Sequence, residues 1–402
     1  MMKLIGMLVV LLVASTGGGC ARTLEQQRVD ATLAIAALEK GDFESAGRHA
    51  DEVLGRGDDN AYAHLVRAFQ RYHDTMSRLF ADFQTVVIAA MGLGRSNARY
   101  LKTALAQAEA SLESVEEDLA AATRPDIVLD FCPGCWNRDW NQDGRIDSRD
   151  EWLFAVDLDA DGNEIPAGDS RRHPTFRFDV GDVVWARAFI AFHRAALDLA
   201  LAFSWLDLAP QVLNTSSSDR IVIPLIEPPR VSSARDRILE GIDLAAQSRE
   251  LILAETDDER EWLPSPTQKD HAIPMSVDSQ LFDTWDGILN DVRRLLKAEE
   301  GLSAAEMISL DDSTQISHPP TGYINLGKMF DEPKDIVVEI ETIDALDHDK
   351  NTDALFKQFF GKYYVSNMKP SPILKRAARM KDEIDSGLEP MERKLRYLLW
   401  LN

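Results

Sequence analysis

The sequence predicts a mainly α-helical protein: a helical bundle with repeat-like helical hairpins, an inserted calcium-binding loop region and a small C-terminal β-hairpin. Three observations lead to this fold class. Apolar residues recur at helical spacing through most of the chain, whereas an acidic segment in its middle lacks that period. Runs of strand-forming residues follow residue 309. With 402 residues, 45% of them hydrophobic, the chain is long enough for two or three domains with a buried core.

The amino terminus has the parts of a secretory signal peptide. Lys3 supplies a positive charge, residues 4–13 are apolar, and small residues lead to Cys20. The apolar run is too short to span a bilayer. Because it ends on a cysteine, the segment resembles a bacterial lipoprotein signal, which implies that residues 1–19 are removed and that Cys20 is lipidated. Ala21 then implies an outer-membrane lipoprotein that faces the periplasm or the cell surface. Ordinary cleavage near Ala21 is the alternative.

The net charge of −23, from 67 acidic and 44 basic residues, limits the partners. Such a surface repels nucleic acid and anionic lipid heads, so neither is expected to bind. It favours divalent cations.

Residues 139–150, DWNQDGRIDSRD, carry the pattern of a calcium loop. Gly144 permits the sharp turn, and the carbonyl of Arg145 stands at the position of the backbone ligand. Calcium takes six to eight oxygens, which a short segment supplies only by curling round the ion. A metal-free turn is the alternative. The side-chain ligands are Asp139, Asn141, Asp143, Asp147 and Asp150.

Only the exit side of this loop is expected to be helical, because Pro133 and Gly134 interrupt the entry side. A loop with only its exit helix, and with Asp at the last position, resembles one repeat of a dockerin-type calcium module, a relative of the EF-hand. The resemblance covers this loop and its exit helix alone. Without a second matching repeat, cohesin docking is not expected. The matching residues are Asp139, Asn141, Asp143, Gly144, Ile146, Asp147 and Asp150.

A second acidic run begins at Asp157. Its first half fits the loop pattern, but Gly168 occupies the last position and Pro166 interrupts the run. We interpret it as a degenerate second calcium site, with no metal binding as the alternative. Its ligands would be Asp157, Asp159, Asp161, Asn163 and Asp169.

Cys132 and Cys135 are the only cysteines besides Cys20, an even pair that suits an oxidising compartment. A structural disulfide before the calcium loop is the favoured interpretation. A thiol-disulfide redox centre is the alternative. Zinc is disfavoured because no histidine stands near the pair on the side of the loop.

The N-terminal region, residues 20–123, is expected to be helical. The run of residues 41–61, with Gly41, Phe43, Ala46 and Ala50, resembles the second helix of a tetratricopeptide repeat and the start of the next. Only one repeat is visible, so a helical hairpin is expected and not an array. Long helices are predicted at 61–91 and 97–122.

The remaining chain divides into three regions. Residues 124–182 form the CxxC and calcium-loop region, 183–310 a helical core and 311–402 a C-terminal α+β region. In the core, residues 183–208 are expected to be the central buried helix, with Arg187 and Arg194 either reaching acids of the loops or lying at solvated ends. Further helices are predicted at 232–254, 279–298, 371–385 and 390–401. Strands at 323–330 and 336–343 are expected to pair as a hairpin.

The sequence contains few patterns typical of catalytic sites, so an enzyme is not the favoured interpretation. The chain has no HExxH, GxSxG or phosphate-binding glycine loop. Ser366 and Lys369 match SxxK, but the companion motifs are missing. We expect a calcium-binding envelope lipoprotein that binds or scaffolds another envelope protein, with Ca²⁺ as a structural ion. The alternative is a metal-assisted hydrolase of envelope polymers.

Overall fold

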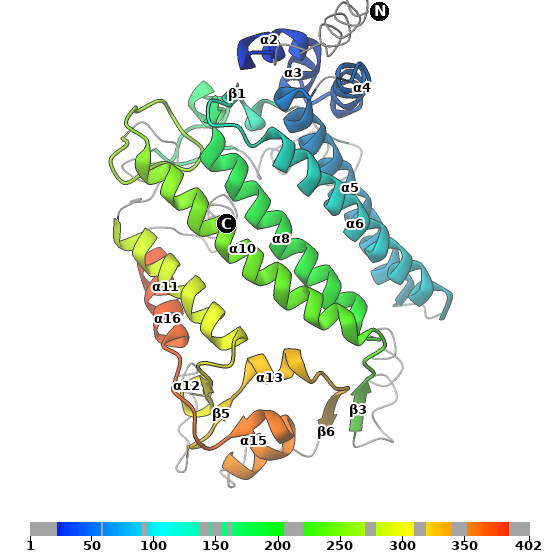
Figure 1. Ribbon diagram of the computed structural model, residues 1–402, viewed down its shortest axis with the longest axis vertical. Coiled ribbons are helices and arrows are strands. Elements are labelled where there is room, and N and C mark those ends of the chain that lie inside the picture. Colours follow the sequence, from blue (N-terminus) through cyan, green and yellow to red (C-terminus); the bar gives the residue numbers. More distant parts are fainter. Residues whose placement is uncertain are drawn as a thin grey trace, which may run out of the picture.

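The computed structural model describes ten stretches of the chain: residues 22–57, 59–90, 95–136, 145, 155–159, 163–204, 220–269, 279–308, 319–339 and 352–385. The fold is mainly α-helical, with a few short antiparallel strands, and this confirms the predicted fold class. Long helices lie side by side in the order α5, α6, α8, α10, α11 and α16, and the shorter elements gather at the two ends (Figure 1).

The N-terminal helices form one end of the molecule. They are α2 (Leu24–Asp30), α3 (Thr32–Glu39) and α4 (Phe43–Leu54), followed by α5 (Ala61–Ala90) and α6 (Arg95–Ala122). The predicted break between α3 and α4 falls at Gly41, whose φ of +69° favours glycine. Asp42 then caps α4 by accepting a hydrogen bond from the Ser45 amide. Ala108, Leu112 and Val115 of α6 are buried in the core of the N-terminal helices.

The centre of the molecule is a hairpin of α8 (Val180–Ala202) and α10 (Pro228–Ala254). Both faces of α8 are buried. Ile190 and Leu197 belong to a cluster with the N-terminal helices, whereas Val184 and Ala188 belong to a cluster with α10 and α11 (Ser279–Leu296). The central buried helix predicted from the sequence is therefore present, beginning three residues earlier than expected.

Ion pairs join α8 to α6. Arg187 pairs with Glu116 at 3.0 Å, and Arg194 pairs with Glu109 at 2.9 Å. The sequence-based expectation for these arginines was wrong, because their partners lie on a helix and neither arginine lies at a helix end. A helical period alone does not say which neighbouring helix supplies the opposite charge.

In the described residues, three small sheets connect distant parts of the chain. Strand β1 (Leu129–Phe131) pairs with β2 (Phe176–Phe178), and β3 (Arg220–Ile223) pairs with β6 (Ile336–Glu339), both antiparallel. In the third sheet, β5 (Tyr323–Ile324) lies between β4 (Leu302–Ser303) and β7 (Tyr364–Val365).

The predicted C-terminal hairpin is corrected in its pairing. Strand β5 is only two residues long, because Asn325 caps a short helix, α13 (Leu326–Asp331), which takes most of the predicted first strand. Strand β6 is present but pairs with β3 from the helical core. The two predicted strands therefore do not pair with each other. Each pairs with strands from other parts of the chain.

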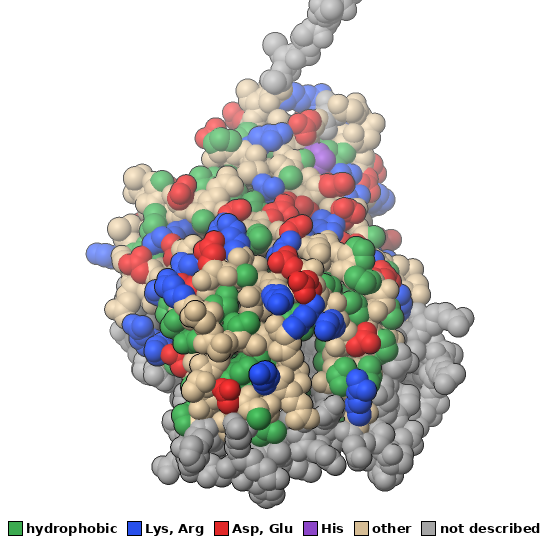
Figure 2. Space-filling model, turned by 60° about the horizontal axis from the view of Figure 1, so that its bottom comes forward, with side chains coloured by type: hydrophobic (Ala, Val, Ile, Leu, Met, Phe, Trp, Pro, Cys, Tyr) green, Lys and Arg blue, Asp and Glu red, His purple; other side chains and the backbone are tan. Residues whose placement is uncertain are grey.

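The C-terminal part is completed by α12 (Ala304–Ile308), α15 (Thr352–Phe360) and α16 (Ile373–Asp385). Asp291, fully buried on α11, pairs with Arg294 and with Arg376 of α16. Acidic and basic side chains are interspersed on the lower face of the molecule (Figure 2). The helix predicted at residues 390–401 lies outside the described residues.

Within the described part of the chain, no helix combines the length and the apolar character needed to cross a membrane.

Candidate functional site

Most ligands of the predicted calcium loop lie outside the described residues. This is true of Asp139, Asn141, Asp143, Asp147 and Asp150, and also of Asp161 and of the lipidation site Cys20. Arg145 is described and is exposed. The structure does describe the chain on both sides of the loop.

The chain before the loop is held in the N-terminal core. Cys132 and Cys135 are joined by a disulfide across a short helical turn, η1 (Pro133–Cys135). The next residue, Trp136, is buried, and its indole N–H donates a 2.7 Å hydrogen bond to the carbonyl of Leu38 at the end of α3. Its ring packs edge-on against Phe43, with 5.0 Å between the ring centroids.

The chain after the loop is also held. Ala155 and Val156 are buried, and the Val156 amide donates a 2.8 Å hydrogen bond to the carbonyl of Arg172. Arg172 ends a short helical turn, η2 (Ser170–Arg172), which leads into β2. Since β2 pairs with β1, the loop segment leaves and re-enters the same small sheet region.

The second acidic run is closed as a hairpin. Leu158 and Glu164 form an antiparallel bridge, the Asp159 amide donates to the Asn163 carbonyl at 2.9 Å, and the Ile165 amide donates to the Asp157 carbonyl at 2.9 Å. The Asp159 carboxylate accepts a 2.8 Å hydrogen bond from the Asn163 amide. These hydrogen bonds hold the two sides of the run together without a metal ion. Its metal binding stays a prediction.

The Asp169 carboxylate interacts with the nearby residue Arg171. Its carboxylate caps η2 by accepting from the Arg171 amide at 2.9 Å, and it pairs with the Arg171 guanidinium at 2.7 Å. These hydrogen bonds lower the pKa of Asp169 to about 2. Among the described residues, no three His, Cys, Asp or Glu side chains are arranged to hold a metal ion.

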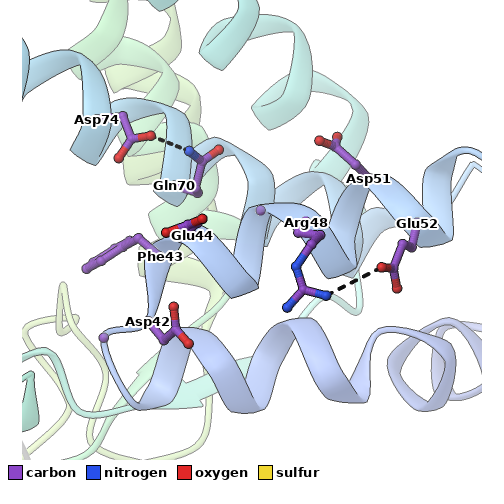
Figure 3. A pocket seen from close by; sticks show the side chains of 10 residues that line it. Asp42, Phe43, Glu44, Arg48, Asp51, Glu52, Gln70 and Asp74 are labelled. Carbon is purple, nitrogen blue, oxygen red and sulfur yellow. Dashed lines mark hydrogen bonds and ion pairs between the residues drawn. The ribbon is translucent and has the colours of Figure 1, made fainter.

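A groove of about 960 Å³ lies over α4 and the adjoining part of α5 (Figure 3). Gly41 and Gly47 contribute backbone to its lining, and Arg48, paired with Glu52, is its only basic residue among those described. Hydrogen bonds from Ser45 lower the pKa of Asp42, so this carboxylate stays charged. The acidic side chains around the groove are Asp42, Glu44, Asp51, Glu52 and Asp74.

The sequence did not predict this groove. Asp42, Glu44, Asp51 and Glu52 lie in the run that resembles a repeat helix, and Asp74 belongs to the next helix. The available signal was the excess of acids over bases from residue 42 to residue 52. Only the packing of α4 on α5 shows that Asp74 joins the same surface (Figure 3).

Comparison with models of known protein families, with curated proteins and with solved structures finds no match for this chain.

Proposed function

We propose that this chain is an exported, calcium-binding lipoprotein of the cell envelope that binds or scaffolds another envelope protein. Lipidated Cys20 would anchor it, and Ca²⁺ would be a structural ion in the loop of residues 139–150. One observation supports this role best: both ends of the loop segment are fixed, at buried Trp136 and at buried Ala155, beside paired strands β1 and β2.

A fixed exit and re-entry make a structural ion effective. The loop links the α5–α6 pair to the α8–α10 hairpin, and its four carboxylates repel one another when no cation is present. Asp139, Asn141, Asp143, Asp147 and Asp150, with the carbonyl of Arg145, form a set of hard oxygen donors that suits Ca²⁺. In such a site the ion supplies charge neutralisation and cross-linking of the segment.

The groove on α4 supports the binding part of the proposal. Five carboxylates and one arginine surround it, and the lower face of the molecule shows mixed charges instead (Figure 2). Helix α2 begins only four residues after Cys20, so this surface belongs to the end of the chain that the lipid would hold. The complementary partner is a protein segment rich in Lys and Arg.

Calcium titration of the full chain, purified in detergent, tests the metal. A weak extracellular-type site with a dissociation constant of about 10⁻⁴ M would stabilise the fold by about 2.7 kcal/mol at a hundredfold excess of ion. We expect calorimetry to find this site in the wild type and to lose it in Asp143→Ala. Thermal melting in chelator should remove the added stability of the wild type alone.

The matched control is Asp236→Ala, which removes one exposed carboxylate from α10, away from the loop. It should keep the calcium response of the wild type. If calcium adds no stability to the wild type, or if Asp143→Ala responds as the wild type does, the structural-ion proposal is wrong.

Capture of partners from envelope extract tests the binding role. We expect the wild type, but not Glu44→Lys combined with Asp74→Lys, to retain a basic partner, and retention should weaken with salt. Equal retention by both chains would remove the groove from the proposal and leave the calcium site untouched.

A further inference from the structure

Four carboxyl groups meet where α8 begins and α10 ends. Asp179 caps α8, and Asp182 completes a capping box with it. Glu255 caps the end of α10, and its hydrogen-bonding partners are the Asp179 carboxyl and the Gln268 amide, the latter at 3.2 Å. A Cβ built on Gly181 would lie 3.1 Å from Oδ1 of Asp179 and 3.4 Å from Oε1 of Glu255, so the two acids face each other across that glycine. Glu261 follows in the connection after α10.

Two of these groups are buried and only partly satisfied. Asp182 is 6% exposed and Glu261 is 4% exposed. Oδ2 of Asp182 accepts from the Asp179 amide at 3.2 Å, whereas Oδ1 of Asp182 and Oε2 of Glu261 have no hydrogen-bond partner among the described residues. A buried carboxylate oxygen without a donor is costly, and a bound proton removes much of that cost.

The surroundings supply little positive charge. Arg177 of β2 is the cation that faces Glu261, and it is already shared with Asp130 of β1 and with Glu259. Asp257 adds another negative charge from the connection. The N-terminus of α8 favours negative charge at Asp179, but the C-terminus of α10 opposes it at Glu255. Arg177, which has two other acidic partners, is therefore a weak counter-charge for Glu261.

The segment after α10 that carries Glu261 also packs against β2. The Arg177 amide donates to the Arg260 carbonyl at 3.0 Å, and the Trp262 amide donates to the Arg177 carbonyl at 3.1 Å. The Trp262 ring stacks on Phe178, with 5.2 Å between the centroids. The segment that carries Glu261 is therefore held against β2, the strand that leads into the start of α8.

We propose that Asp182, Glu255 and Glu261, packed against Asp179, form a proton-binding cluster, in which their protons latch the 255–269 segment and β2 onto the start of α8. Loss of these protons sets like charges against one another and loosens the latch. The proposal is independent of the calcium loop, because none of the four acids belongs to it.

The pKa shifts have the direction that this arrangement requires. Burial, together with the Asp179 charge, raises the pKa of Glu255 to about 9 and that of Glu261 to about 8, from an ordinary value of 4.5. Burial raises the pKa of Asp182 well above its ordinary value. Below pH 4.5 the folded and unfolded chains both hold the protons of Glu255 and Glu261. Between pH 4.5 and about 8–9 only the folded chain keeps them, so unfolding releases protons and stability falls as pH rises.

The test is the pH dependence of unfolding of the full chain from pH 6 to pH 8. Each proton released on unfolding raises the unfolding constant about tenfold per pH unit. Asp182, Glu255 and Glu261 would each release a proton on unfolding, so we expect about a thousandfold rise per unit for the wild type and about a hundredfold rise for Glu261→Gln and for Glu255→Gln. The matched control is Glu250→Gln, on the exposed side of α10, which should keep the wild-type slope.

Infrared spectra of the folded chain give a second readout that does not depend on unfolding. The wild type should show the C=O stretch of protonated carboxyl groups at pH 7, weakened in Glu261→Gln and lost above pH 9. The proposal fails if that band is missing at pH 7, or if both glutamine variants keep the wild-type slope. It fails equally if Ca²⁺ binds at pH 9 in a way that Glu261→Gln abolishes, because the ligand would then be a metal ion.

Discussion

The two ends of the α8–α10 hairpin differ in how many basic side chains surround their buried acids. At one end, Asp198 is 2% exposed and receives Arg230 at 2.7 Å, Arg237 at 2.8 Å and the Ser233 hydroxyl at 2.8 Å, all from α10. At the other end, four carboxyl groups meet, and Arg177, which faces Glu261, also pairs with Asp130 and Glu259. One pair of helices thus carries both arrangements.

The difference shows what a buried carboxyl group needs. Where guanidinium groups supply charge and donors, the acid can stay ionised inside the protein, because coulombic attraction and hydrogen bonds offset desolvation. Where they are missing, desolvation wins and the acid keeps its proton. Asp198 and Asp182 are both buried aspartates, so the difference between the two ends lies in their neighbours.

The largest effect is expected from breaking the arginine-rich end. Asp198→Ala leaves Arg230 and Arg237 without their shared acceptor and should lower the free energy of unfolding by about 3 kcal/mol in urea titrations. Asp236→Ala, an exposed position on the same helix, should change it by less than about 0.5 kcal/mol. A cost at Asp198 as small as that of the control would mean that this network adds nothing to stability.

A second arginine-neutralised acid, Asp118, sharpens the comparison through pH. Burial by itself would raise its pKa, but hydrogen bonds from His64 and Arg67 outweigh that effect and lower it below 3.8. The stability that Asp118 contributes is therefore present above the unfolded-state pKa and lost as pH falls through the folded-state pKa. This is opposite in sign to the carboxyl cluster.

Asp118→Asn should accordingly lower the free energy of unfolding by about 2 kcal/mol at pH 7, and the difference from wild type should vanish near pH 2. Chemical unfolding across that range measures it. The matched control is Asp51→Asn, which removes an exposed partner of the same Arg67. A difference that grows on acidification would contradict the assigned sign.

The packing between α10 and α8 is tested at Gly241, which lies against the ring of Phe192 from α8. A Cβ there would be 2.6 Å from Cε1 of Phe192, so Gly241→Ala should cost about 1–3 kcal/mol by forcing the ring aside. Urea unfolding compares it with Gln247→Ala on the exposed side of α10. If Gly241→Ala stabilises the fold as ordinary helix propensity predicts, the two helices are not in such close contact.

The smallest effect is expected from the disulfide beside β1. A four-residue loop closed by Cys132 and Cys135 should contribute at most about 2 kcal/mol through loop-closure entropy. Melting of the wild type with and without reductant measures this, and a Cys132→Ser, Cys135→Ser variant should not respond to reductant. An unchanged wild-type melting temperature would mean that buried Trp136 holds this segment by itself.

Some parts of the fold could be predicted from the sequence, and others could not. The break at Gly41 and Asp42, the limits of α5 and α6, and the central helix follow from apolar period and turn residues, which act locally. The pairing of β6 could not be predicted, because its partner β3 lies more than a hundred residues earlier. The spacing of acidic residues predicted the calcium loop. For the carboxyl cluster, the sequence shows only the capping pair Asp179 and Asp182.

The sequence by itself determined that this chain would be helical, where its long helices would begin and end, and which short segment carries a calcium-ligand pattern. Only the tertiary structure decided which charges meet. It set Asp198 among arginines and gathered Glu255 and Glu261 beside Asp179, where the arginine that faces Glu261 also pairs with other acids. The physical reason is that periodicity is a property of neighbours along the chain, whereas desolvation and charge pairing depend on groups that only folding brings within a few ångströms.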